Sequence, residues 1–139
     1  MKENLKLVMK NAYANISNYK VACIIVMQNN QEVIGVNIEN KDGKSGMCAE
    51  QVAIANAFSE GFSTKDFKEI HVMGSSKGIC MPCFMCRELL HEYFLPDTKV
   101  FCYNNRGKCK EFKISDICPY PHRHQSFLRP FVEGRGQGR

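Results

Sequence analysis

Two short cysteine motifs have the residue types and the separation of a metal site. Residues 48–50 read Cys-Ala-Glu, and residues 82–86 read Pro-Cys-Phe-Met-Cys. On the first turn of a helix, Cys83 and Cys86 can point their sulfurs at one ion, and Cys48 on a neighbouring helix can complete a triangle. Three protein ligands leave the fourth tetrahedral position of zinc open to water, which is typical of a catalytic zinc site and not of a structural one.

Both motifs stand at expected helix starts, and this position favours ionised sulfur. Residues 48–60 contain no glycine or proline, and Pro82 stands directly before the second expected helix. The partial positive charge of a helix N-terminus favours a thiolate over a thiol. Glu50 is too close to Cys48 in the sequence to be a further ligand, but it can reach a water molecule at the open position. We therefore predict that Glu50 carries protons in catalysis.

Two alternatives without catalysis use the same cysteines. Cys80, which lies shortly before Pro82, could be a fourth ligand that closes the zinc site. The chain could also be a binding module that contains zinc but has no activity. Neither alternative gives Glu50 a role, so the catalytic interpretation is the stronger one.

Hydrophobic periodicity and turn residues predict the elements that position the two motifs. We expect helices at 4–15, 48–60, 83–94 and 115–118, and strands at 21–27, 32–38, 69–73, 99–103 and 111–114. Because helices alternate with strands, the sheet should be covered on both faces, as a three-layer α/β/α domain of the α/β class. Residues 1–121 should form this one catalytic domain, and residues 122–139 a basic, flexible C-terminal tail.

Composition excludes several classes of protein. No apolar run reaches the roughly 18 residues of a membrane span, and the N-terminus shows no signal peptide, so we expect a cytoplasmic protein with no membrane contact. In that compartment the eight cysteines should be reduced and free of disulfides. Residues 120–139 carry +3 of the net charge of +5. The nearly neutral remainder offers no electrostatic footprint for nucleic acid, which we do not expect as a partner.

The combination of Cys-Ala-Glu with Pro-Cys-x-x-Cys resembles the three-cysteine signature of zinc deaminases. Over residues 4–121 the chain is similar to the cytidine deaminase family in its small homotetrameric form. In that family an Asn-x-Glu-Asn strand end binds the ribose, eleven residues before the zinc cysteine, and Asn37 has this offset from Cys48. An aromatic residue followed by x-Val flanks the base in the family, and Tyr19 occupies its place here.

The resemblance implies a mixed five-stranded sheet, a homotetramer and a role in pyrimidine salvage. The implied reaction is zinc-dependent hydrolytic deamination of cytidine or deoxycytidine to uridine or deoxyuridine, with release of ammonia. The substrate is thus a small nucleoside, and the cofactor is Zn²⁺. The implied site residues are the metal ligands Cys48, Cys83 and Cys86, the catalytic Glu50, and the substrate-binding Asn37, Glu39, Tyr19, Ala49 and Met81, the last two through their backbone groups.

Departures from the family pattern concern the substrate more than the reaction. Gln51 stands where the family usually has an arginine that donates hydrogen bonds to the thiolates, so the sulfurs should keep more negative charge on zinc. Deaminases of the antibiotic blasticidin S share both motifs and also lack that arginine, so such a cytosine-containing small molecule is the alternative substrate. Polynucleotide deaminases usually have histidine in place of Cys48 and need a basic channel, which the sequence does not offer.

Overall fold

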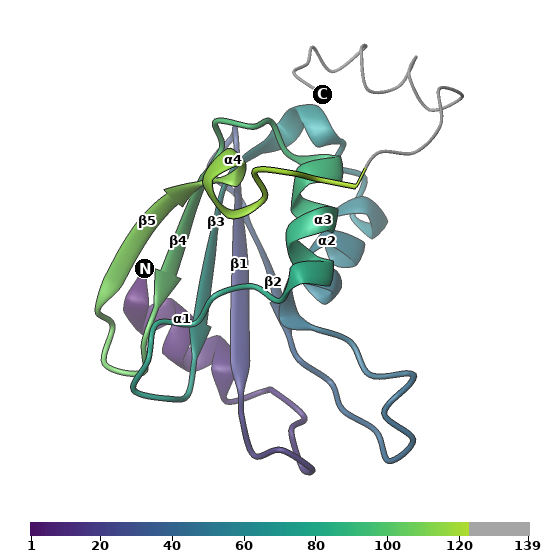
Figure 1. Cartoon of the computed structure of the whole chain (residues 1–139), viewed down its shortest axis with the longest axis vertical. Coiled ribbons are helices and arrows are strands. Elements are labelled where there is room, and N and C mark those ends of the chain that lie inside the picture. The colour runs from purple at the N-terminus through teal and green to yellow at the C-terminus, as the bar shows by residue number, and fades with distance from the viewer. Residues whose placement is uncertain (123–139) are drawn as a thin grey trace.

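A mixed five-stranded sheet in the order β2-β1-β3-β4-β5 forms the middle layer of the structure (Figure 1). The structure is a computed structural model and describes residues 1–122. Only β3 and β4 are parallel, with α3 as the crossover between them, and the other neighbours are antiparallel. The strands are β1 (Val21–Met27), β2 (Glu32–Val36), β3 (Phe67–Gly74), β4 (Lys99–Tyr103) and β5 (Cys109–Lys113).

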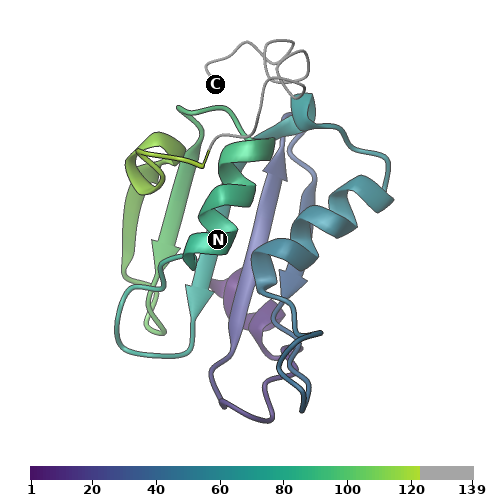
Figure 2. The ribbon, with the colours of Figure 1, turned by 45° about the vertical axis from the view of Figure 1, so that its right-hand side comes forward.

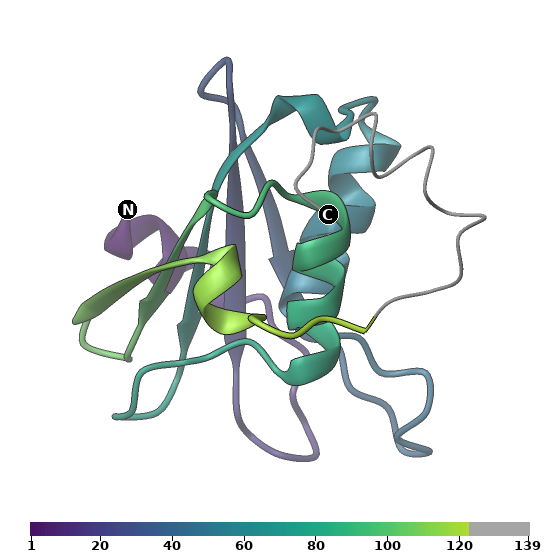
Figure 3. The same cartoon turned by 45° about the horizontal axis from the view of Figure 1, so that its top comes forward.

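Helices cover both faces of this sheet, as predicted. Helix α1 (Lys2–Met9) lies on one face, and α2 (Ala49–Ser59) and α3 (Phe84–Tyr93) lie side by side on the other (Figures 2 and 3). Alternate residues of the fully apolar β1 belong to two separate hydrophobic cores. Cys23 and Ile25 pack in the core under α2 and α3. Ala22 and Ile24 pack in the core under α1. This two-sided burial explains why β1 reads as a continuous apolar run. The three-layer α/β/α prediction is confirmed.

The largest correction to the predicted elements is at the N-terminus, where the helix ends at Met9 and not near residue 15. Tyr13 instead forms a bridge with Ile38, in which its N–H donates to the Asn37 carbonyl and its carbonyl accepts from the Glu39 N–H. Backbone groups committed to a neighbouring strand end are not available to a helix. The last strand is also longer than predicted and runs from Cys109 to Lys113.

The remaining elements agree with the predictions to within a few residues. A short 3₁₀ helix, η1 (Thr64–Asp66), was not predicted, and the chain's last described helix is α4 (Ile114–Ile117). Of the predicted tail, only His122 lies within the described residues, so the 121/122 boundary stays a prediction. Within residues 1–122, no helix is both long enough and apolar enough to cross a membrane.

Gly35 on β2 lets α2 lie unusually close to the sheet. A Cβ atom at Gly35 would lie 2.4 Å from both the Ala49 carbonyl oxygen and the Ala53 nitrogen. The closest approach is therefore at the first turns of α2, the part of the helix that carries the Cys-Ala-Glu motif. At its other end α2 stops before Gly61, which has a φ of +95° and so serves as the predicted C-terminal glycine.

Candidate active site

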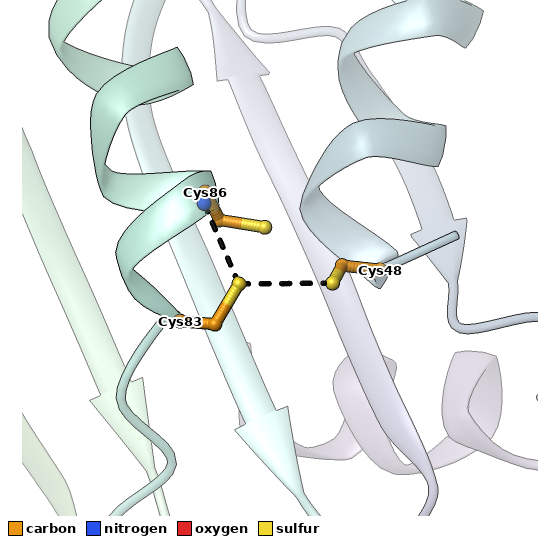
Figure 4. A group of neighbouring side chains, drawn as sticks. All are labelled: Cys48, Cys83 and Cys86. Carbon is orange, nitrogen blue, oxygen red and sulfur yellow. Dashed lines mark hydrogen bonds between the residues drawn. The ribbon is translucent and has the colours of Figure 1, made fainter. Parts of the chain in front are cut away.

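The structure brings the three predicted cysteines together between the starts of α2 and α3. Cys48 is the N-cap of α2, Cys83 is the N-cap of α3, and Cys86 lies on the first turn of α3 (Figure 4). Their sulfur atoms all lie within 4.8 Å of one another, and those of Cys48 and Cys83 are 3.8 Å apart. Sulfurs bound at about 2.3 Å to a tetrahedral zinc ion are separated by about 3.8 Å, so the trio fits this metal.

The donor chemistry of the trio also suits a divalent cation. The Cys86 N–H donates to the Cys83 sulfur at 3.4 Å, which is the helix-end stabilisation expected from the sequence. The pKa of the Cys48 thiol is lowered to about 6, mainly by a hydrogen bond with Cys86 and to a smaller extent by one with Cys83. The hydrogen bond between Cys48 and Cys86 also raises the pKa of Cys86. One sulfur thus ionises readily, and a cation can displace the remaining protons.

Cys80 does not close this site. Within residues 1–122, the trio is the only group of three or more cysteine, histidine or acidic side chains with metal-binding proximity, and Cys80 is not part of it. Cys80 is buried and its thiol is hydrogen-bonded to Tyr19. The arrangement therefore leaves an open position for a fourth ligand, and the closed-site alternative loses its support.

Glu50 is buried beside the sulfurs, with 4% of its surface exposed. Burial, reinforced by the charge of Cys48, raises the pKa of the Glu50 carboxyl to about 7. A carboxyl group with this pKa can both accept and release a proton near neutrality.

A cavity of about 430 Å³ opens in front of Glu50. Cys86 is fully buried and is not one of the residues that line this cavity. The other eight predicted site residues all line the cavity: Tyr19, Asn37, Glu39, Cys48, Ala49, Glu50, Met81 and Cys83.

Asn37 and Glu39 have protein partners that the sequence analysis missed. The Asn37 amide accepts a hydrogen bond from the Val21 N–H at 2.9 Å and donates one to the Tyr19 carbonyl at 2.8 Å. Asn37 therefore joins the end of β2 to the start of β1. The Glu39 carboxylate accepts hydrogen bonds from the backbone N–H groups of Ile16 and Ser17, both at 3.0 Å. No spacing in the sequence signals these contacts, because the partners lie more than 15 positions apart.

Tyr19 is held at its hydroxyl end as well as by its backbone. Its hydroxyl is hydrogen-bonded to Cys80 and Ser76, and burial raises its pKa to about 12. A Cβ atom at Gly74 would lie 2.1 Å from this hydroxyl oxygen, so the glycine at the end of β3 makes room for it. Cys80 lines the cavity, and Gly74 makes room for Tyr19. From the sequence we considered Cys80 only as a possible fourth zinc ligand, and no pattern pointed to Gly74.

Gln51 caps α2 in this site. Its side-chain oxygen accepts the Cys48 N–H at 2.7 Å, and its amide nitrogen lies 4.0 Å from the Met85 sulfur. Arg87 donates through Nε to the Pro82 carbonyl at 2.8 Å, and its guanidinium lies 4.4 Å from the centre of the Phe84 ring. The spacing of a cap residue and a glutamine three positions later is a capping-box signal, which could have revealed the role of Gln51.

Comparison with known proteins identifies the family of the chain. A family model described as the cytidine and deoxycytidylate deaminase zinc-binding region matches residues 1–103. The chain belongs to the cytidine deaminase family. The cytidine deaminase of Mycoplasma genitalium is 38% identical over 115 residues, which cover 83% of this chain and 87% of the relative. A blasticidin-S deaminase of Bacillus cereus is 32% identical over 111 residues, which cover 74% and 76%.

The cytidine deaminase fold is also matched by a solved structure. The crystal structure of cytidine deaminase from Burkholderia pseudomallei superposes with a TM-score of 0.82 at 30% identity, covering 86% of this chain and 94% of that one. The predicted family and the mixed five-stranded sheet are therefore confirmed. Zinc, the metal of the family's motif region, is the cofactor that the sulfur geometry fits.

Proposed function

We propose that this protein is a zinc-dependent hydrolase that deaminates cytidine and deoxycytidine, with release of ammonia and formation of uridine and deoxyuridine. One observation carries the proposal: three sulfurs are spaced for a tetrahedral ion, and two of them, on Cys48 and Cys83, line the same cavity as the buried, protonatable Glu50. In this proposal Cys48, Cys83 and Cys86 hold the zinc ion and leave its fourth position open.

The charge of the cavity favours a nucleoside over a nucleotide. The family description covers both cytidine and deoxycytidylate deaminases. Among residues 1–122, those that line the cavity include the carboxyl groups of Glu39 and Glu50 but no lysine, arginine or histidine. A 5′-phosphate would therefore find no basic side chain of the described residues to pair with, and it would enter close to two acidic groups. We infer that the substrate is uncharged at its 5′ position.

The proposed mechanism assigns proton transfer to Glu50. Zinc, when bound, supplies the Lewis acid that makes a water molecule nucleophilic near neutral pH. Glu50 accepts one proton of the water that attacks C4 of the base and passes it to ring N3. It then takes the second proton from the new C4 hydroxyl and delivers it to the amine, which leaves as ammonia while the C4 carbonyl forms. A pKa of about 7 for Glu50 suits a group that must receive and return a proton.

The other cavity residues orient the nucleoside. In this proposal the backbone groups of Ala49 and Met81, which both line the cavity, form hydrogen bonds with the edge of the cytosine base. Tyr19, fixed at both of its ends, flanks the base. Asn37 and Glu39 line the same cavity and bind the ribose, and the remaining lone pairs of the Glu39 carboxylate can accept hydroxyl hydrogens.

Blasticidin S is the second candidate substrate. It is favoured by the similarity to a blasticidin-S deaminase and by Gln51, which caps α2 where the family pattern has arginine. Ultraviolet absorbance and ammonia release should be measured with cytidine, deoxycytidine, deoxycytidylate and blasticidin S in parallel. We expect turnover of the two nucleosides and little of deoxycytidylate. Bound zinc without ammonia release from any pyrimidine nucleoside would refute the proposal and favour a non-catalytic binding module.

We further propose a homotetramer that works in pyrimidine salvage in the cytoplasm. Three apolar side chains near the sulfurs support the assembly: Phe84, Met85 and Met47 are 76%, 55% and 44% exposed. The sulfurs must also stay reduced to bind metal, which supports a reducing compartment. Light scattering coupled to gel filtration should give a mass close to four chains, and a monomer would contradict the assembly.

A further inference from the structure

A single hydroxyl group connects two parts of the cavity wall that lie far apart in the sequence. The loop of residues 14–20, which we name the Ser17 loop, leads into β1 and carries Tyr19. The Ser17 hydroxyl donates a hydrogen bond to Oε2 of Glu39, and Oγ of Ser17 accepts a hydrogen bond from the Tyr19 N–H at 3.0 Å. Ser17 therefore links the carboxylate of Glu39 to the backbone of Tyr19, and both of these residues line the cavity.

Hydrogen bonds rather than burial hold the Ser17 loop in place. Ile16 is 62% exposed, and Ser17 and Asn18 are exposed as well. Asn18 has a φ of +58°, in the left-handed region that asparagine tolerates, and its N–H donates to the Ala14 carbonyl at 2.8 Å. Because residues 16–18 bury little apolar surface, this part of the loop depends on its bonds to Glu39.

The Glu39 carboxylate keeps acceptor capacity for a ligand. Oε1 accepts two backbone N–H groups, from Ile16 and Ser17, and Oε2 accepts the Ser17 hydroxyl. An ionised carboxylate offers about four acceptor sites, so one remains, on Oε2. The hydrogen bond from the Ser17 hydroxyl is the largest of the effects that lower the pKa of Glu39. The Glu39 carboxyl group is therefore ionised at neutral pH. The three bonds fix the direction in which the remaining lone pair points.

We propose that Ser17 is a positioning residue for the substrate, which aims the Glu39 carboxylate at a ribose hydroxyl and at the same time holds Tyr19 against the base. This inference rests on the proposed function. It predicts that the ribose and base ends of the cavity are coupled through Ser17, although Ser17 is not itself a lining residue.

The first test is the kinetics of Ser17→Ala. We expect KM for cytidine to rise about tenfold with kcat changed by less than about twofold, because the lost bond orients a group that binds substrate and transition state alike. Ser17→Thr, which keeps the hydroxyl, should restore KM. With 2′,3′-dideoxycytidine, which lacks the 2′ and 3′ hydroxyls that Glu39 could bind, the effect of Ser17→Ala on KM should be smaller, because only the effect through Tyr19 remains.

The matched control is Ser63→Ala. Ser63 makes the same kind of contact on η1, where its hydroxyl lies 3.3 Å and its N–H 2.7 Å from Oδ2 of Asp66. This pair is not part of the cavity lining, so Ser63→Ala should leave KM unchanged. A Ser17→Ala enzyme with the wild-type KM for cytidine overturns the inference and leaves the proposed function standing.

A second measurement does not depend on activity. Hydrogen exchange should show a faster Tyr19 N–H in Ser17→Ala than in the wild type or in Ser63→Ala, because that N–H loses its acceptor. Glu39→Gln should release the same loop, and Ser17→Ala/Glu39→Gln should exchange no faster than the faster single variant. Unchanged exchange at Tyr19 overturns the inference and leaves the proposed function standing, whereas a wild type without turnover of cytidine or deoxycytidine overturns the proposed function and, with it, the substrate role of Ser17.

Discussion

Gly35→Ala should disturb the active site although Gly35 itself does not line the cavity. The added Cβ would lie 2.4 Å from the Ala49 oxygen and the Ala53 nitrogen, where ordinary contact begins at 3.4 Å. Both obstacles are backbone atoms, so no side chain can rotate out of the way. The first turns of α2 must therefore retreat by about 1 Å, the difference between these distances, and must carry Cys48 and Glu50 with them.

The size of the effect follows from this displacement. Overpacking of this kind lowers the free energy of unfolding by about 1–3 kcal/mol. Replacing a glycine within a strand by alanine offsets roughly 0.5 kcal/mol of this loss, because alanine loses less backbone entropy on folding. For a domain of this length, a net loss of about 2 kcal/mol lowers the melting temperature by about 8 °C. A shift of about 1 Å in catalytic groups can cost about 100-fold in rate, so activity should fall more steeply than stability.

The assay for Gly35→Ala combines thermal melting, zinc content by mass spectrometry and the rate of cytidine deamination. Gly78→Ala is the matched control, because nothing lies within 4 Å of a Cβ at Gly78, and its free energy of unfolding should change by less than about 0.5 kcal/mol. A Gly35→Ala protein with the melting temperature, zinc content and rate of the wild type would refute the steric argument.

Three further predictions concern the site and the core. Glu50→Gln should keep its zinc, as measured by mass spectrometry, and lose about 10²–10⁴ in kcat; an unchanged kcat would rule out the proton-transfer role. Removal of zinc by a chelator should abolish deamination and lower the melting temperature, because the ion joins the starts of two helices, and an unchanged melting temperature would contradict this link. His71 is buried between the Tyr103 hydroxyl at 2.7 Å and the Glu69 carboxylate at 2.6 Å, and burial lowers its pKa. The folded state therefore binds fewer protons there than the unfolded chain, so stability is full above the ordinary value of 6.5 and is lost as the pH falls below it. In melts between pH 5 and 8, His71→Gln should show a weaker acid dependence than the wild type, and an identical dependence would exclude His71 as its source.

Local patterns predicted most of the elements because each depends on neighbours in the chain. The apolar run of β1 and the glycine-terminated α2 were visible in this way, and so were the two cysteine motifs at helix starts. The first helix was predicted too long because residues 11–13 have helical periodicity. The backbone of Tyr13 is instead hydrogen-bonded to the segment that follows β2, where its bridge partner Ile38 lies 25 positions away.

Sequence alone determined the chemistry of this protein: the types and spacing of Cys48, Glu50, Cys83 and Cys86 predict an open three-sulfur zinc site with a proton carrier. Tertiary structure decided what holds that chemistry in place. Gly35 sets the height of α2 above the sheet, Gly74 makes room for the Tyr19 hydroxyl, and Ser17 joins Glu39 to the backbone of Tyr19. These contacts join segments 14 to 55 positions apart. Such contacts leave no periodic trace in the chain, because only the folded sheet brings their partners within bonding distance.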